Sequence, residues 1–184
     1  MTTIDTGKAI IVMGVSGVGK TTVAQALAAE IAGRYVEADE FHPPENIAAM
    51  AKGIPLTDVM RRPWLEALSE VMQKARTSQP ETPVVVACSA LKRAYRDILR
   101  AKNPDAIVIY LEADPEVIRA RMAAREDHFM PSSLLDSQLA TLQRPAPNEA
   151  CVTEDANLPL SQMVRQLCNA LKARDCADGL TSSC

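Results

Sequence analysis

Short apolar runs alternate with longer amphipathic segments along most of the chain. Residues 9–13 read AIIVM, a continuous apolar run that is typical of a strand buried on both faces. Further runs of this kind lie at residues 35–37, 84–88 and 106–111, and residues 151–153 form a weaker candidate strand. Because helical patterns separate these strands, the sequence predicts an α/β fold, with a parallel five-stranded sheet and helices on both faces.

The segments between the apolar runs have helical spacing and recognisable ends. An alanine-rich segment stops before Gly33, and Asp114 with Pro115 supplies a typical helix start. Ser133, with Asp136 three residues later, resembles a capping box for a short helix. Apart from this short helix, the expected helices cover residues 21–32, 46–52, 63–76, 91–102, 114–125 and 160–173.

The composition narrows the class of protein. Of the 184 residues, 47% are hydrophobic, which is enough for a full core, and we expect one domain over residues 1–174 and a flexible tail over residues 175–184. The net charge of −3 disfavours nucleic-acid binding through bulk charge. No run approaches the roughly 18 apolar residues of a membrane span. The five cysteines include no CxxC pair, and residues 1–10 contain no apolar signal core, so we expect reduced thiols in a cytoplasmic protein.

The first apolar run leads directly into a phosphate-binding motif. Residues 14–21 read GVSGVGKT and match the pattern GxxxxGK[ST] between a strand and a helix. Glycines let the backbone turn so that its N–H groups face phosphate oxygens, and the following helix directs its N-terminal dipole to the same anion. Lys20 can reach the β- and γ-phosphates, and the Thr21 hydroxyl can bind Mg²⁺. The motif predicts a nucleoside triphosphate with Mg²⁺, held by Gly14, Val15, Ser16, Gly17, Val18, Gly19, Lys20, Thr21 and Thr22.

The rest of the sequence favours a kinase over a GTP switch or a motor ATPase. A GTP switch needs a base-reading NKxD motif, and residues 102–105 carry those letters in the wrong order. A motor ATPase usually has an aspartate at the end of the third strand, where residues 86–89 read VACS. Two arginines instead follow the fourth strand, in a candidate lid at about residues 121–140. Because phosphoryl transfer needs positive charge around the γ-phosphate, Arg121 and Arg125 are candidate catalytic residues, and a solvated basic face is the alternative.

The second strand runs into the polar stretch VEADEFHPPEN at residues 36–46. We interpret Asp39 as the group that faces the reacting hydroxyl, as a base or as an orienting group, with a turn-capping role as the alternative. Glu37 lies two residues earlier, on the same face of the strand, and is a candidate to hold Mg²⁺ through a water molecule. His42 is a candidate to bind a substrate hydroxyl, or is a structural turn residue. No cysteine or second histidine lies nearby, which disfavours a zinc site.

Several separated motifs resemble the gluconokinases of the P-loop kinase group. They are MGVSGVGKTT at 13–22, ADEFHPPEN at 38–46, KGIPLTD at 52–58, RRPWL at 61–65, ACSALKRAYRDILR at 87–100 and HFMPSSLLDSQLATLQRP at 128–145. The resemblance covers about residues 10–149. The chain departs from the family pattern at Ala38, where glycine is common, and at Met60, where an acid is common. The change at Met60 puts in doubt a local salt bridge that would orient Arg61.

The resemblance implies a three-layer P-loop kinase fold, like that of nucleoside monophosphate kinases, and phosphorylation of D-gluconate to 6-phospho-D-gluconate by ATP. It also implies a cytoplasmic homodimer. A carboxylate substrate needs a cation, and its hydroxyls need donors and acceptors, so the candidate substrate contacts are Asp39, His42, Arg61, Lys92, Arg96 and His128. A kinase for shikimate or for a nucleoside monophosphate is the alternative enzyme. A non-catalytic nucleotide-binding regulator is the alternative from another class.

Overall fold

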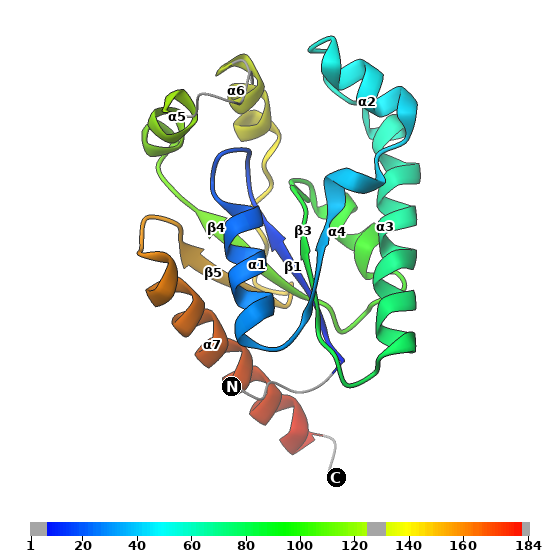
Figure 1. Cartoon of the computed structure of the whole chain (residues 1–184), viewed down its shortest axis with the longest axis vertical. Helices are drawn as coiled ribbons and strands as arrows, with labels where there is room; N and C mark the ends of the chain where they lie inside the picture. Colours follow the sequence, from blue (N-terminus) through cyan, green and yellow to red (C-terminus); the bar gives the residue numbers. More distant parts are fainter. Residues whose placement is uncertain (1–6, 125–131, 182–184) are drawn as a thin grey trace.

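A parallel sheet of five strands forms the centre of the protein (Figure 1). The computed structural model describes residues 7–124 and 132–181. The spatial order of the strands is β2-β3-β1-β4-β5. Their bounds lie within two residues of those that the apolar runs predict: β1 (Ala9–Met13), β2 (Arg34–Glu37), β3 (Val84–Ala87), β4 (Ile107–Glu112) and β5 (Cys151–Asp155).

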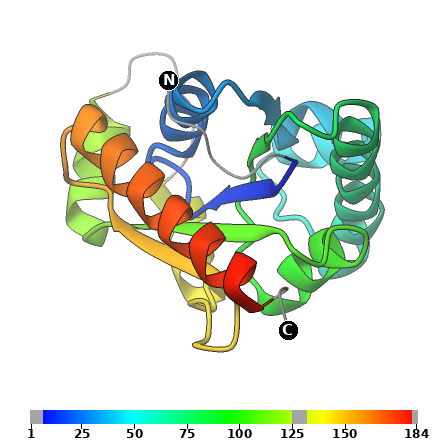
Figure 2. The same cartoon turned by 90° about the horizontal axis from the view of Figure 1, so that it is seen from below.

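Helices cover both faces of the sheet and rise above the edge at which the strands end (Figure 1). Figure 2 shows α1 and α7 on one side of the sheet and α3 and α4 on the other. None of the helices in the described part of the chain is both long and apolar enough to cross a membrane. The helices are α1 (Lys20–Glu30), α2 (Pro44–Ala51), α3 (Asp58–Ser78), α4 (Arg93–Arg100), α5 (Pro115–Ala123), α6 (Ser132–Thr141) and α7 (Leu160–Thr181), and a 3₁₀ turn, η1 (Ala38–Phe41), follows β2.

Alternate residues of β1 contribute to two separate cores. Ile10 and Val12 pack with apolar residues of α1 and α7, whereas Ile11 and Met13 pack with those of α3 and α4. All four side chains are completely buried. A strand that is covered on both faces needs apolar residues at every position, which explains the continuous run in the sequence.

Helix α3 begins one turn earlier than the sequence reasoning predicts. The sequence predicts Pro63 as its first residue, but the helix starts at Asp58. Thr57 caps it, because the Thr57 hydroxyl oxygen accepts a hydrogen bond from the Met60 N–H at 3.3 Å. Pro63 therefore lies inside the helix, close to its start, where its missing N–H removes a single backbone hydrogen bond. The capping residue, rather than the proline, sets the start of this helix.

Helix α7 extends past the point at which a flexible tail was expected. The prediction of a tail from Asp175 onward is wrong as far as Thr181, because the helix continues to that residue. Two contacts hold it where the tail was expected to begin. The Lys8 ammonium donates to Asp175 Oδ1 at 2.7 Å, and the Arg174 guanidinium donates to the Cys151 carbonyl oxygen at 2.6 Å.

A buried ion pair joins α4 to the segment that precedes β5. Arg96 has no exposed surface, and its Nε and Nη2 donate to the two carboxylate oxygens of Glu149 at 2.6 and 2.9 Å. Its Nη1 donates to the carbonyl oxygens of Ala90 and Gln143 at 3.1 and 3.0 Å. All three guanidinium nitrogens donate to protein acceptors and Arg96 does not line the pocket of the candidate site, so the structure does not support the prediction that Arg96 binds the substrate. Arg96 also holds the pKa of Glu149 below its usual range, so the carboxylate is ionised.

We predict that Arg96→Leu destabilises the protein by about 3–5 kcal/mol, because it leaves the buried Glu149 carboxylate without its cation. Arg93 supplies a matched control on the same helix, since its side chain is 43% exposed and reaches Glu149 only at 4.0 Å. Arg93→Leu should cost about 1 kcal/mol or less. Urea unfolding measures both changes, and equal losses in the two variants would contradict a special role for the buried pair.

Candidate active site

A pocket of about 450 Å³ opens where β1, β2 and β3 end. Its walls come from the phosphate loop, from the ends of β2 and β3, and from the segment between α2 and α3. Met122, Ser137 and Gln138 line it from the lid side. Ligands of open parallel α/β sheets bind in the crevice outside the carboxyl ends of the strands, so the pocket lies where the fold class predicts a site.

The phosphate loop has the backbone shape that its motif predicts. Gly14, Gly17 and Gly19 have φ angles of 149°, 83° and 104°, in the region that favours glycine. Helix α1 begins at Lys20, so its free N–H groups and the positive end of its dipole face the loop. The Lys20 ammonium donates to the Val15 carbonyl oxygen at 3.0 Å. The loop is therefore arranged to bind an anion.

Thr21 and Glu37 form an oxygen-rich corner beside the phosphate loop. The Thr21 hydroxyl donates to Glu37 Oε2 at 2.9 Å, and the Tyr35 hydroxyl donates to the same oxygen at 2.5 Å. Burial, and then the hydrogen bond to Glu37, raise the pKa of Tyr35, so this phenol is a neutral donor at physiological pH. With its proton directed at Glu37, the Thr21 oxygen is free to offer a lone pair to a cation. Mg²⁺ prefers such oxygen ligands, so the corner fits it.

This corner is the arrangement in the site that best suits a metal ion. Within residues 7–124 and 132–181, no cluster of three or more His, Cys, Asp or Glu side chains is placed to hold one. A metal that binds here would therefore complete its ligand set with phosphate oxygens and water, as Mg²⁺ commonly does.

Asp39 and His42 follow β2 directly, on η1 and just after it. Asp39 Oδ1 lies 3.7 Å from His42 Nε2, and 79% of the Asp39 side chain is exposed to the solvent of the pocket. His42 is buried, and its ring stacks on the Trp64 ring with centroids 4.0 Å apart. The nearby His42 ring nitrogen, and then the charge of Lys20, hold the pKa of Asp39 below its usual range. Asp39 is thus an ionised carboxylate that faces the pocket.

Arg61 lines the pocket on the side away from the lid. Its Nε donates to the Leu56 carbonyl oxygen at 3.3 Å, and the guanidinium carbon lies 5.8 Å from the centre of the Tyr95 ring. These contacts orient Arg61 although Met60 stands where the family commonly has an acid. The structure therefore brings Asp39, His42 and Arg61 together around one pocket, as the sequence reasoning expects.

Lys92 lies at the edge of the site, bound to an acid that the sequence reasoning missed. Its ammonium donates to both carboxylate oxygens of Asp58 at 2.7 and 2.8 Å, and the Tyr95 hydroxyl donates to Asp58 Oδ1 at 2.6 Å. Lys92 is not among the residues that line the pocket. The sequence could have indicated Asp58 as a site residue, because Asp58 is the last residue of the KGIPLTD motif.

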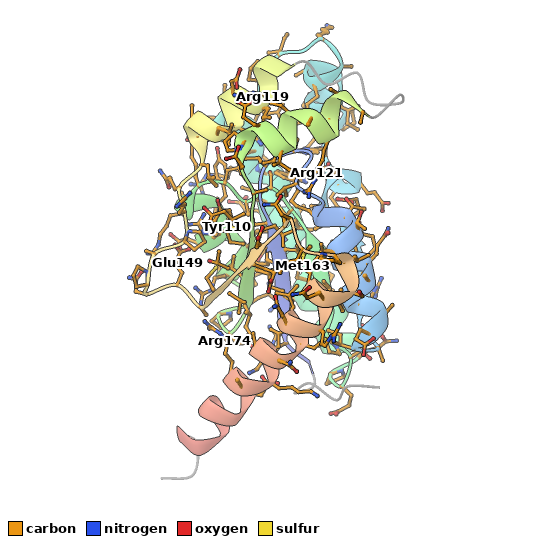
Figure 3. The ribbon with its side chains drawn as sticks, turned by 90° about the vertical axis from the view of Figure 1, so that its left-hand side faces the viewer. Tyr110, Arg119, Arg121, Glu149, Met163 and Arg174 are labelled. Carbon is orange, nitrogen blue, oxygen red and sulfur yellow. The ribbon has the colours of Figure 1, made fainter. Side chains whose placement is uncertain are left out.

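The predicted lid residues are placed only in part. Arg125 and His128 lie outside the described residues. Arg121 belongs to α5, and its guanidinium donates to the Ala156 carbonyl oxygen at 2.9 Å, in the turn after β5 (Figure 3). It does not line the pocket in this structure, so a role at the γ-phosphate requires movement of Arg121 and stays a prediction.

The lid side contacts the apex of the phosphate loop through Gln138 and Met122, neither of which was a candidate site residue. Gln138 Oε1 accepts from the Ser16 N–H at 2.7 Å, and Gln138 Nε2 donates to Ser16 Oγ at 3.0 Å. Met122 packs so closely on Gly17 that a β-carbon added there would lie 2.6 Å from Met122 Cγ. Both residues lie in the predicted lid, and Gln138 also belongs to the motif at residues 128–145.

Three features of the site define a P-loop kinase of small molecules. They are the phosphate loop, the ionised acid after β2, and the helices that contact the loop from the lid side. A family model described as an AAA domain matches residues 10–145. The thermosensitive gluconokinase of Escherichia coli (strain K12) is 40% identical over 168 residues, which cover 91% of this chain and 89% of that protein.

Two crystal structures extend this similarity. A gluconokinase from Sinorhizobium meliloti 1021 matches with a TM-score of 0.84 and 43% identity, over 97% of this chain and 98% of that one. A sugar kinase from Janibacter sp. HTCC2649 matches with a TM-score of 0.81 and 48% identity, over 87% of this chain and 91% of that one. The chain belongs to the gluconokinase family, which confirms the resemblance that the separated motifs indicate.

We predict that Gly17→Ala weakens ADP binding about tenfold or more, because alanine is strained by about 1–2 kcal/mol at a left-handed position. The new methyl group would also meet Met122. Gly19→Ala is the control for strain alone, since φ is +104° there and nothing lies within 4 Å of its added β-carbon. Adding Met122→Ala should restore part of the affinity in Gly17→Ala and none in Gly19→Ala, as measured by calorimetry. No recovery in either background would contradict a close lid contact.

Proposed function

We propose that the protein transfers the γ-phosphoryl group of ATP to a hydroxyl of D-gluconate and forms 6-phospho-D-gluconate and ADP. The observation that carries the proposal is a phosphate loop and the ionised Asp39 carboxylate in one pocket, in a chain of the gluconokinase family. Relatives named gluconokinase in bacteria and eukaryotes support gluconate as the acceptor, over shikimate or a nucleoside monophosphate.

The ATP phosphates are proposed to bind the N–H groups of the phosphate loop and the start of α1. Lys20 would exchange the Val15 carbonyl oxygen for phosphate oxygens. The Thr21 hydroxyl would hold Mg²⁺ directly, with Glu37 acting through a water molecule. Mg²⁺ supplies positive charge that offsets the charge of the migrating phosphoryl group.

The acceptor is proposed to lie between Asp39 and Arg61. The Asp39 carboxylate accepts a hydrogen bond from the reacting hydroxyl and aims its oxygen at the γ-phosphorus. A loose phosphoryl-transfer transition state gains more from this orientation than from strong base catalysis. The Arg61 guanidinium matches a carboxylate through two parallel hydrogen bonds, and His42 supplies a donor for a hydroxyl.

Movement on the lid side completes the proposal. Arg121, released from the Ala156 carbonyl oxygen, and Arg125 would close over the γ-phosphate, with His128 at the rim. Lys92 would contact the substrate or the phosphates if it leaves Asp58. We further propose that the chain forms one domain, with a lid at about residues 121–140, and that it works as a cytoplasmic homodimer. The location and the homodimer rest only on what the resemblance of the separated motifs implies.

We predict that Asp39→Asn lowers kcat with gluconate by about 10²-fold or more, because the neutral amide oxygen is a weaker acceptor for the reacting hydroxyl than a carboxylate and cannot take up its proton. Its affinity for ATP, measured by calorimetry, should stay close to that of the wild type. Glu40→Gln, a neighbouring exposed acid that does not line the pocket, should leave both quantities unchanged. Near-normal turnover by Asp39→Asn would contradict the assigned role.

The wild-type protein should release ADP most efficiently with gluconate when kcat/KM is compared across gluconate, other sugar acids, shikimate and nucleoside monophosphates. The reason is that Arg61, which lines the pocket, has a guanidinium that matches a carboxylate, while Asp39 and His42 have polar groups that match hydroxyls. An ADP-release assay with Mg²⁺ and ATP makes the comparison. Turnover of another acceptor without gluconate would overturn the acceptor assignment. Nucleotide binding with no turnover of any acceptor would favour a regulator instead.

A further inference from the structure

The imidazole of His42 is held from several sides. Its ring stacks on Trp64 at an interplanar angle of 19°, and the Trp64 Nε1–H donates to the Ala38 carbonyl oxygen at 2.8 Å. His42 Nδ1 lies 3.4 Å from Asn46 Nδ2, and His42 Nε2 lies 3.7 Å from Asp39 Oδ1. The Nδ1 edge therefore faces Asn46, and the Nε2 edge faces the catalytic carboxylate.

The orientation of the Asn46 side-chain amide follows from its second contact. Asn46 lies in the first turn of α2 and is 1% exposed. Its Nδ2 donates to the Met60 carbonyl oxygen at 3.0 Å. If the amide were turned round, Oδ1 would face that carbonyl oxygen, and two acceptors would be opposed. The end of the amide that faces both Met60 and His42 must therefore be the NH₂ group, which has one hydrogen for each.

An amide N–H that points at His42 Nδ1 requires a lone pair on that nitrogen. In a neutral imidazole one nitrogen is a donor and the other an acceptor, so the proton must then lie on Nε2. We infer that Asn46 is a positioning residue that holds His42 in the Nε2–H tautomer. His42 thereby presents a hydrogen-bond donor to Asp39 and to an acceptor hydroxyl bound beside it.

The inference deepens the proposed function, because its effect on turnover rests on the role of Asp39. With the proton on Nδ1, the Nε2 lone pair would face the Asp39 carboxylate and repel it. The carboxylate would then lose the donor that keeps its oxygen in place for the reacting hydroxyl. A purely structural tie between α2 and α3, through the Met60 carbonyl oxygen, is the competing interpretation, and the experiment below separates the two.

Asn46→Asp provides the sharpest test, because a carboxylate accepts where the amide donated and should move the His42 proton to Nδ1. The ring-nitrogen shifts of ¹⁵N-labelled protein, recorded without substrate at about pH 8, above the ordinary imidazole pKa, identify the tautomer. The chain has two histidines, so His128→Gln assigns the signals. We expect Nε2–H with an unprotonated Nδ1 in the wild type, a protonated Nδ1 in Asn46→Asp and a mixture of the two tautomers in Asn46→Ala, which only removes the donor.

Asn103→Asp is the matched control. Asn103 is also fully buried, and its Nδ2 donates to the carbonyl oxygens of Ser69 and Leu99 at 3.1 and 3.2 Å, away from the pocket residues. Both substitutions bury a carboxylate next to backbone carbonyl groups, so both should lower stability. Only Asn46→Asp should change the tautomer and lower kcat with gluconate, on the order of 10- to 100-fold, with ATP affinity retained.

Three results would overturn the inference: Nδ1–H or a doubly protonated ring in the wild type, an unchanged tautomer in Asn46→Asp, or an equal loss of kcat in Asn103→Asp. Failure of the proposed function gives a different pattern. In that case the tautomer shifts as expected, because the spectra contain no substrate, while Asp39→Asn retains normal turnover.

Discussion

The register of three parallel strands decides where the chemistry of this protein takes place. Glu37 of β2 pairs with Ala87 of β3, and Ala87 pairs with Val12 of β1. The phosphate loop begins two residues after Val12, and Asp39 follows two residues after Glu37. Both segments therefore leave the sheet at the same level of its carboxyl edge. A slip of one residue in β2 would turn Glu37 to the other face of the sheet and separate it from Thr21. The backbone hydrogen bonds of the sheet thus fix the distances on which the site depends.

This alignment brings two carboxylates next to a site for a polyanion, and the surrounding cations and donors make the combination possible. His42 and Lys20 hold the pKa of Asp39 below its usual range. The hydroxyl groups of Thr21 and Tyr35 both donate to the same carboxylate oxygen of Glu37 and hold it in place. An ionised carboxylate accepts hydrogen bonds only, so Asp39 is suited to orienting a hydroxyl. The nearby Lys20 supplies positive charge of the kind that stabilises a phosphoryl-transfer transition state.

The sequence predicts those parts of the fold and the site that depend on local signals. Apolar runs indicate the five strands, and the glycine pattern indicates the phosphate loop, because each signal lies within a few consecutive residues. Contacts between distant residues leave no such pattern. Arg96 was taken for a substrate ligand because a buried structural arginine and a functional one look alike until the partner is known, and Glu149 lies 53 residues away. The contact of Lys8 with Asp175, which holds α7 where a tail was expected, spans 167 residues.

The two departures from the family pattern show why backbone contacts tolerate changes of side chain. At Met60 the structure uses only main-chain groups, since the N–H donates to the Thr57 hydroxyl and the carbonyl oxygen accepts from Asn46. Ala38 likewise contributes its carbonyl oxygen, which accepts from the Trp64 Nε1–H. Ala38 is not among the described residues with positive φ, so its backbone has no need of glycine. His42 is therefore held by a tryptophan and an asparagine that both rest on main-chain carbonyl groups, and either departure leaves that support intact.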